Sequence, residues 1–244
     1  MQTEAVRALR ELCPTLSVGV LTADLMNLER ELSIIQNEGV KLLHIDVMDG
    51  CFCPQMTVGP PFIKKIRTPL LKDVHLMVTD PVGKIPEYVA AGADIVTVHV
   101  ESTHHVHRAV QQLGSVKNVN DPARGLVRGL ALNPGTPLEA VNPLLDEIDM
   151  VVLLAVNPGW AGQKLTPWFC DRVVKARQML DDAGKPEILI MIDGGITRDN
   201  IQTVSRLGAD IIVTGSAVFD GKAAGENARF MLNAVREEKK RGIQ

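Results

Sequence analysis

The sequence predicts an α/β fold in which eight parallel strands and their helices form a (β/α)8 barrel, the architecture of a TIM barrel. Apolar, strand-like runs alternate with helical segments until eight runs are counted within 244 residues, a length typical of one such barrel. Most runs are continuously apolar, as expected for parallel strands covered on both faces. A doubly wound open sheet would also alternate, but it usually opens with a glycine-rich dinucleotide fingerprint, and the chain has none.

The first barrel unit pairs the short apolar run Leu16–Val20 with a helical pattern over Asp24–Asn37. Asp24 is a favourable N-cap for this helix, and Gly39 is a favourable residue to end it. Thr3–Leu12, ahead of the first run, is a candidate amphipathic helix.

Seven further apolar runs are predicted as strands. They are Val40–Val47, Asp73–Val78, Asp94–Val100, Gly129–Leu132, Met150–Val156, Ile188–Ile192 and Asp210–Val213. Helical segments are predicted between most of them and after the last. They are Val82–Ala91, His105–Leu113, Trp168–Asp182, Arg198–Leu207 and Lys222–Lys239. The similar phrases Glu38–Val40, Ala91–Asp94 and Leu207–Asp210 indicate a repeated helix C-cap and turn.

We expect residues 1–244 to form a single domain, because no linker-like stretch interrupts this alternation. Residues 1–14 are predicted as an N-terminal extension of the barrel. Residues 117–128 are rich in Asn, Asp, Pro and Gly and are predicted as a polar surface insertion.

Composition excludes several classes of protein. The net charge of −3 and the 3% of aromatic residues argue against a nucleic-acid-binding surface. No apolar run approaches the roughly 20 residues of a membrane span, and residues 1–12 lack the pattern of a secretory signal. Four cysteines do not make a disulfide framework in a chain of this length. We therefore expect a cytoplasmic protein without nucleic-acid or membrane partners.

Candidate metal ligands lie at the predicted C-terminal ends of three strands, where barrels of this kind place their active sites. His44 and Asp46 share one face of the second strand, since side chains alternate with a period of two. His75 lies near the end of the third strand, and Asp193 directly follows the seventh. Any one of them alone would be interpreted as a capping residue, but two imidazoles and two carboxylates at one mouth favour a shared metal ion.

The remaining histidines are less informative. His99, at the end of the fourth strand, either lines the mouth or bonds to local backbone. His104, His105 and His107 resemble a metal cluster, but their place at a loop-to-helix junction favours solvated or capping residues.

Glycines gather in the loops after the sixth, seventh and eighth strands, at Gly159, Gly162, Gly194, Gly195 and Gly215. Glycine lets backbone approach a ligand closely, and free N–H groups at helix starts attract anions. Because barrels often bind phosphate with the loops after strands seven and eight, a phosphorylated small molecule is the expected ligand.

These features together resemble the ribulose-phosphate 3-epimerase family of metal-dependent (β/α)8 barrels. The resemblance is carried in order by stretches 44–50 with Phe52 and Pro54, then 73–77, 133–137, 157–163, 193–195 and 215–219. It implies an isomerase of carbohydrate metabolism in the pentose phosphate class, which converts D-ribulose 5-phosphate to D-xylulose 5-phosphate. The implied mechanism is proton transfer between two carboxylates through an enediolate.

The resemblance also assigns roles to residues. It implies metal ligation by His44, Asp46, His75 and Asp193, with Asp46 and Asp193 as the acid–base pair. The implied substrate contacts are Met48, His75, Met77, Gly159, Trp160, Ala161, Gly162, Gly194, Gly195, Gly215 and Ser216. With two histidine and two carboxylate ligands, Zn2+ is the preferred metal, and Mn2+, Fe2+ or Co2+ remain open. The resemblance further implies a homo-oligomer.

Two positions depart from the family pattern. Gly19 stands where the family carries a substrate-contacting serine, and Gln55 stands where it carries an asparagine. Ser17 shares the strand face of Gly19 and is a candidate for pointing into the barrel deeper down. These departures keep open a 3-epimerase of another ketose phosphate, such as allulose 6-phosphate, and a non-catalytic phosphosugar-binding barrel. A phosphosugar decarboxylase is disfavoured because the second-strand stretch has His44 and no lysine.

Overall fold

Eight strands, all parallel to their neighbours and hydrogen-bonded in sequence order, close into a barrel. The structure is a computed structural model that describes residues 3–160 and 162–241. The strands are β1 (Thr15–Gly19), β2 (Leu42–Met48), β3 (Leu71–Met77), β4 (Ile95–His99), β5 (Val127–Leu132), β6 (Met150–Leu154), β7 (Leu189–Asp193) and β8 (Ile211–Thr214). The predicted (β/α)8 barrel is therefore confirmed.

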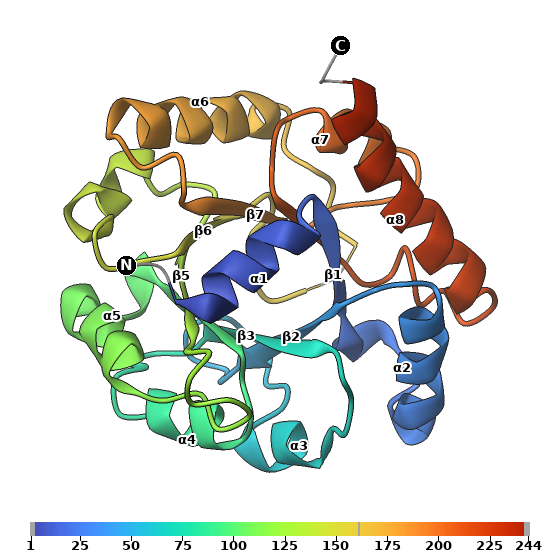
Figure 1. The fold of residues 1–244 in the computed structure, drawn as a ribbon, viewed down its shortest axis with the longest axis horizontal. Coiled ribbons are helices and arrows are strands. Elements are labelled where there is room, and N and C mark those ends of the chain that lie inside the picture. The colour runs from blue at the N-terminus through green and yellow to red at the C-terminus, as the bar shows by residue number, and fades with distance from the viewer. Residues whose placement is uncertain (1–2, 161, 242–244) are drawn as a thin grey trace.

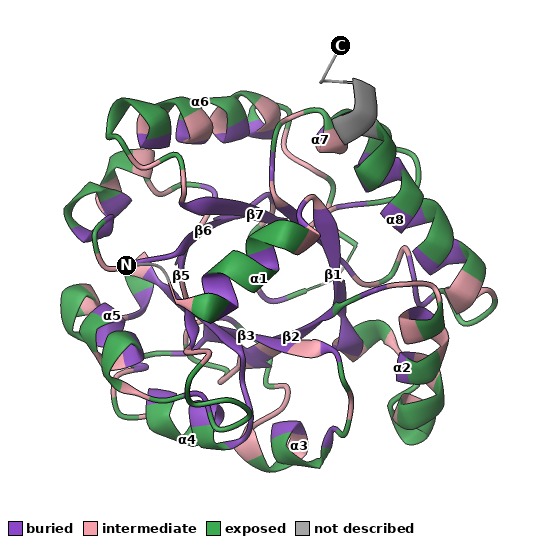
Figure 2. Ribbon diagram, in the orientation of Figure 1, coloured by how far each residue is buried: buried purple, intermediate pink, exposed green. Residues whose placement is uncertain are grey.

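The helices surround the barrel, except that the first of them lies across one of its ends (Figure 1). They are α1 (Glu4–Leu12), α2 (Leu28–Asn37), α3 (Pro60–Lys65), α4 (Ile85–Ala90), α5 (Val106–Ser115), α6 (Phe169–Asp182), α7 (Ile201–Ser205) and α8 (Ala224–Arg241). Short 3-10 turns are η1 (Val20–Thr22), η2 (Leu25–Asn27), η3 (Val100–Ser102) and η4 (Leu138–Leu144). Figure 2 shows that the outer helices bury the faces turned to the strands and expose the opposite faces.

Two connections between strands contain helical segments that were not predicted, and prolines explain both. Helix α3 begins with two consecutive prolines, which are tolerated in the first turn of a helix but are typical of loops in a sequence. Between β5 and β6 the connection is η4, which contains Pro143. The helix predicted from Asp24 also begins later, because Asp24 caps the short turn η2 through its contact with the Met26 N–H, and α2 follows.

The repeated Gly-Ala-Asp phrase connects neighbouring strands as well as ending helices. Gly92 and Gly208 adopt positive φ angles of 98° and 80°. The aspartate that follows accepts a hydrogen bond from the backbone of the preceding strand, from Lys72 N–H to Asp94 and from Ile190 N–H to Asp210. These carboxylates therefore tie the N-terminal edge of the barrel together.

Helix α1 closes this N-terminal end. It lies across the barrel axis in Figure 1, and the fully buried side chains of Val6 and Leu9 pack in one apolar cluster with Leu42, Ile95 and Ile211 from the strands. Thr3 caps the helix, because its Oγ1 accepts a hydrogen bond from Val6 N–H. The amphipathic helix predicted over Thr3–Leu12 thus forms, and it leaves the opposite end of the barrel for ligands.

The prediction of a polar surface insertion over residues 117–128 is wrong for part of that range. Val127 and Arg128 belong to β5. Asn118 is completely buried, and its amide donates to Asp94 and to the Gly125 carbonyl. The loop packs next to α1, since Ala5 N–H donates to the Arg124 carbonyl. Its polar residues satisfy buried backbone and carboxylate groups.

Within the described part of the chain, no helix has both the length and the apolar character required to cross a membrane.

Candidate active site

Four side chains from three strands converge at the C-terminal end of the barrel. His44 and Asp46 come from β2, His75 from β3 and Asp193 from the last position of β7. One ligand atom from each lies within 4.8 Å of the other three. The Nδ1 atom of His75 is 3.3 Å from Asp46 Oδ1 and 3.5 Å from Asp193 Oδ2. The structure thus brings together all four predicted ligands.

Strand register produces this convergence. His44 stands opposite Asp73 on the β2–β3 ladder, and Asp46 stands opposite His75. The side chains of these two facing pairs point to the same face of the sheet, because the two residues on each strand are two positions apart. Asp193 is the last residue of β7, and the C-terminal ends of all the strands lie at one mouth of the barrel, so its side chain lies near the other ligands.

His44 is oriented by a buried carboxylate. Its Nδ1 lies 2.7 Å from Asp73 Oδ2, which also accepts a hydrogen bond of 2.8 Å from the Ser17 hydroxyl. A carboxylate only accepts hydrogen bonds, so the His44 Nδ1 carries the proton in this contact. Its Nε2, 3.2 Å from Asp46 Oδ1, then faces the two site carboxylates.

The donor set fits a divalent metal ion. The His75 Nδ1 is buried and makes no hydrogen bond, although two carboxylates lie close to it. Two imidazole nitrogens and two carboxylate oxygens that face one another need a cation or protons between them. These four residues could therefore hold a metal ion.

Protonation equilibria show how strongly the site favours positive charge. Burial lowers the pKa of His44, but the negative charges of Asp73 and Asp46 outweigh burial and raise that pKa well above its usual value. Burial raises the pKa of Asp46, but His44 and His75 outweigh it and lower this pKa. Without a metal, protons on the histidines would balance the carboxylates, so protons and metal compete for the same nitrogens.

A third histidine lies directly behind the ligands. The ring of His99, from β4, lies edge to edge with the ring of His75: the centroids are 5.0 Å apart, and the two Nε2 atoms are 2.8 Å apart. The His99 Nδ1 is 3.1 Å from Glu101 Oε2. Burial lowers the pKa of His99 to about 4, so this ring is neutral at physiological pH. The sequence left two interpretations of His99 open, a residue that lines the mouth or one that bonds to local backbone. Neither is correct, because its ring nitrogens contact the side chains of His75 and Glu101.

The residues missed from sequence are Asp73 and Glu101. Each lies two positions from a histidine on the same strand or its continuation, Asp73 before His75 and Glu101 after His99. A period of two would have placed them on the histidine-bearing face. Their partners, however, lie across a strand pair or in another loop, which the spacing does not reveal.

The surface histidines His104, His105 and His107 are exposed, and His107 pairs with Glu147 at 2.6 Å. Among the described residues, the only group of three or more metal-binding side chains that could share an ion is the one at the barrel mouth. The structure thus agrees with the interpretation of these three as solvated residues.

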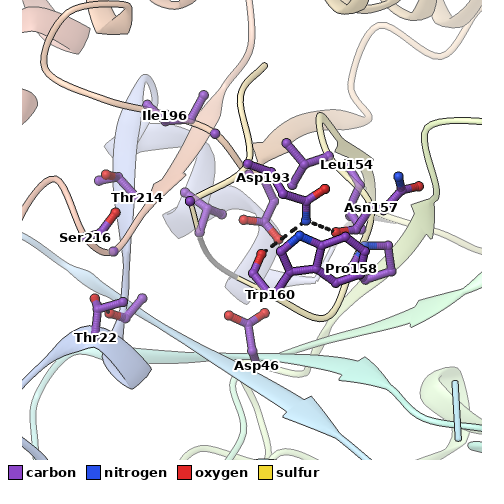
Figure 3. A pocket seen from close by; sticks show the side chains of 18 of the residues that line it. Thr22, Asp46, Leu154, Asn157, Pro158, Trp160, Asp193, Ile196, Thr214 and Ser216 are labelled. Atoms are coloured by element: carbon purple, nitrogen blue, oxygen red, sulfur yellow. Dashed lines mark hydrogen bonds between the residues drawn. The ribbon is translucent and has the colours of Figure 1, made fainter. Parts of the chain in front are cut away.

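A cavity of about 810 Å³ opens above the four ligands. Asp46 and Asp193 point toward its interior from opposite sides in Figure 3. Its lining includes most predicted substrate contacts: Met48, Met77, Gly159, Trp160, Gly162, Gly194, Gly195, Gly215 and Ser216. His75 is completely buried and is not among the lining residues, so the structure does not show it as a substrate contact. Ala161 lies outside the described residues.

The loops after β6 and β7 pack tightly against each other. Gly194 has φ of +99°, and a Cβ there would meet Val156 Cγ2 at 2.5 Å. Gly195 has φ of +68°, and a Cβ there would lie 3.0 Å from Leu165 N. Thr22, Thr214 and Ser216 occupy another wall of the same cavity (Figure 3). This wall thus offers backbone and hydroxyl groups.

Both departures from the family pattern line this cavity. Gly19 is the last residue of β1, and it supplies no hydroxyl to the cavity wall. Gln55 lines the cavity from the segment that follows β2. Ser17 is buried and donates to Asp73, so it points inward but supports a histidine instead of replacing the missing serine.

Comparison with known proteins identifies the family. Residues 15–219 match the family described as the ribulose-phosphate 3 epimerase family. The chain belongs to this family. A ribulose-phosphate 3-epimerase of Bacillus subtilis is 38% identical over 202 residues, covering 82% of this chain and 89% of that protein. Ribulose-phosphate 3-epimerase 1 of Cupriavidus necator is 40% identical over 228 residues, covering 91% of each. The predicted class, an isomerase acting on carbohydrates, is confirmed by this membership of the epimerase family.

Solved structures support the fold of this epimerase-family chain. KGPDC from Streptococcus mutans superposes with a TM-score of 0.67 at 17% identity. The match covers 94% of this chain and 98% of that chain. At this identity the likeness concerns the barrel alone.

Proposed function

We propose that this protein is a metal-dependent 3-epimerase of a ketose phosphate, with D-ribulose 5-phosphate as the first candidate substrate and D-xylulose 5-phosphate as product. One observation carries the proposal. Asp46 and Asp193 face a common cavity from opposite sides, each within reach of the same two imidazole nitrogens. Inverting a carbon next to a ketone requires a base on one face and an acid on the other, which this pair supplies.

His44, Asp46, His75 and Asp193 would hold the metal, which when bound supplies a Lewis acid that stabilises the negative charge of the enediolate. The two-nitrogen, two-oxygen donor set favours Zn2+, while Mn2+, Fe2+ and Co2+ also suit it.

The proton balance needs only the two aspartates. One carboxylate accepts the proton from C3, and the electron pair of that C–H bond moves toward the ketone oxygen. The other aspartic acid then delivers its proton to the opposite face of C3. The sugar keeps its composition, and the protonation states of Asp46 and Asp193 are exchanged, so the reverse reaction starts from the opposite arrangement.

The phosphate of the substrate is assigned to the other wall of the cavity. Backbone near Gly194, Gly195 and Gly215 can approach an anion closely, and the Ser216 hydroxyl can donate to it. Met48, Met77 and Leu154 form apolar contacts nearer the carboxylates, where they would exclude water from the reacting carbon.

A second candidate is the epimerisation of a different ketose phosphate, such as allulose 6-phosphate. Gly19 and Gln55 favour it, because both change the cavity wall where the family pattern has other side chains. A phosphosugar-binding barrel without activity is the remaining alternative. We further expect a cytoplasmic homo-oligomer with no nucleic-acid or membrane partner.

Deuterium exchange tests these alternatives together. The purified protein is loaded with Zn2+ and incubated with each ketose phosphate in heavy water, and NMR follows loss of the C3 proton. Exchange with D-ribulose 5-phosphate that a chelator stops and fresh Zn2+ restores is the expected result. Exchange only with the six-carbon sugar would select the second candidate. No exchange with any ketose phosphate, despite metal binding, would contradict both epimerase assignments.

A further inference from the structure

Three side chains form a continuous hydrogen-bonded chain that ends at the candidate metal site. Glu101 Oε2 is 3.1 Å from His99 Nδ1, and His99 Nε2 is 2.8 Å from His75 Nε2. The other nitrogen of His75 is the one that faces Asp46 and Asp193. The two imidazoles are completely buried, and the side chain of Glu101, at the outer end of these three residues, is 24% exposed.

The direction of the hydrogens follows from Glu101. Its Oε1 accepts hydrogen bonds from the Asn133 N–H, at 2.8 Å, and from the Thr136 hydroxyl. Its Oε2 has no proton to donate, so His99 Nδ1–H must be the donor in their contact. Neutral His99 then offers a lone pair at Nε2, and His75 must donate its Nε2–H to it. Neutral His75 therefore carries its single ring proton on Nε2, and its Nδ1 presents a lone pair to Asp46 and Asp193.

Neighbouring contacts hold both rings in this arrangement. The rings of His99 and His75 are nearly coplanar, with 12° between their planes, and the centroid of the Phe52 ring lies 4.7 Å from that of His99. Arg172 donates to the carbonyls of Asn133 and Thr136 and so supports the loop that binds Glu101. The alternative tautomer of His99 would point a lone pair at a carboxylate that cannot move away.

We propose that Glu101 is a positioning residue that acts through His99 to keep His75 in the tautomer able to bind metal at Nδ1. This inference rests on the proposed metal-dependent function. Asp73 holds His44 in a comparable way, so each imidazole ligand has its own carboxylate that selects which nitrogen carries the proton. Such outer partners typically change metal affinity by about 10- to 100-fold when they are replaced.

Glu101→Gln provides a sharp test because the neighbours dictate how the new amide lies. The Asn133 N–H and the Thr136 hydroxyl hold the amide oxygen at the Oε1 position. The amide NH2 then faces His99 Nδ1, which must become an acceptor. His99 donates from Nε2 instead, and His75 places its proton on Nδ1, toward Asp46 and Asp193. The variant thus reverses both tautomers with almost no change in side-chain size.

The matched control is Glu147→Gln, because Glu147 also pairs with a histidine, His107, but at the surface and outside the cavity lining. Burial lowers the pKa of His75, but the carboxylates of Asp193 and Asp46 outweigh burial and raise it. Long-range proton–nitrogen NMR of histidine-labelled, metal-free protein is therefore recorded at rising pH until His75 is neutral, and it then reports the tautomers. Titration of Zn2+ against a competing chelator reports metal affinity for the wild type and both variants.

We expect the wild type to carry the His75 proton on Nε2 and the His99 proton on Nδ1. In Glu101→Gln both should reverse, with Zn2+ affinity about 10- to 100-fold weaker; Glu147→Gln should match the wild type. Reversed wild-type tautomers would overturn the proposal even if the variant does not fold. So would unchanged affinity in Glu101→Gln, or weaker affinity with unchanged tautomers, which would indicate only a disturbed loop. If the tautomers reverse as expected but the protein binds no metal, Glu101 does set the tautomers of His99 and His75, but the proposed metal-dependent function is overturned.

Discussion

His44 and Asp73 stand directly opposite each other on the β2–β3 ladder, and their side chains meet at 2.7 Å between His44 Nδ1 and Asp73 Oδ2. Asp73 is completely buried, and its other strong contact is the Ser17 hydroxyl. The carboxylate therefore holds the imidazole proton away from the candidate metal site.

Asp73→Asn should weaken Zn2+ binding by about 10-fold or more, because a neutral amide holds the His44 Nδ1 proton less firmly than a carboxylate does. Competition with a chelator measures the affinity. Ser17→Ala is the control, since it keeps the carboxylate and removes one of its donors. It should cost about 1 kcal/mol of unfolding free energy and leave the affinity within about twofold. Equal affinities for Asp73→Asn and the wild type would show that His44 needs no carboxylate partner.

Asp193→Asn should lower kcat by about 100-fold or more, because it removes one of the two groups that exchange protons with C3. Deuterium exchange and product formation measure the effect. Asp146→Asn is a suitable control, because Asp146 is an exposed aspartate whose side chain is 87% accessible. Unchanged turnover in Asp193→Asn would reject the acid–base assignment.

The strands were predictable because most of them are continuously apolar runs, a pattern that can be recognised without knowing which strands are neighbours. The four ligands were predictable because barrel geometry sends strand ends to one mouth. Asp73 and Glu101 were not assigned, because their roles depend on register: Asp73 opposes His44 across a ladder, and Glu101 binds the loop at Asn133. Helix α3 was missed because its two opening prolines are also typical of loops.

Gly19→Ser should restore the hydroxyl of the family pattern and favour D-ribulose 5-phosphate. A Cβ at Gly19 would lie 3.4 Å from Gly215 Cα, an ordinary contact distance, so the variant is expected to fold. One added hydrogen bond of about 0.5 to 1.5 kcal/mol would raise kcat/KM for that substrate by about 2- to 10-fold. Gly19→Ala separates the effect of the hydroxyl from that of the added carbon. The same gain in Gly19→Ala would contradict a role for the hydroxyl.

Leu9→Ala should destabilise the protein without changing its chemistry. Leu9 is completely buried where α1 closes the N-terminal end of the barrel, so its truncation should cost about 2 to 5 kcal/mol of unfolding free energy. The active site lies at the opposite end, and kcat below the unfolding transition should match the wild type. Urea denaturation compares this variant with Leu25→Ala, whose side chain is 42% exposed and should lose under about 0.5 kcal/mol.

Acid should remove the stability that Glu101 contributes. Burial raises the pKa of this carboxyl, but hydrogen bonds from His99, Thr136 and the Asn133 N–H outweigh burial and lower the pKa to about 2. A depressed carboxyl pKa stabilises the folded state fully above the unfolded pKa of about 4.3. The contribution then declines as the pH falls from there through the folded pKa. Only the unfolded chain binds the proton in that window.

The stability difference between the metal-free wild type and Glu101→Gln should therefore be constant above about pH 5 and shrink steadily below about pH 4. Urea denaturation of both proteins across this pH range measures the difference in unfolding free energy. The metal is removed because pH-dependent metal binding would otherwise change the stability of both proteins. Because the amide of the variant cannot ionise, its curve supplies the reference for the titrating groups that do not interact with Glu101. A difference that stays constant down to about pH 3 would show that the contacts of Glu101 do not favour its ionised form.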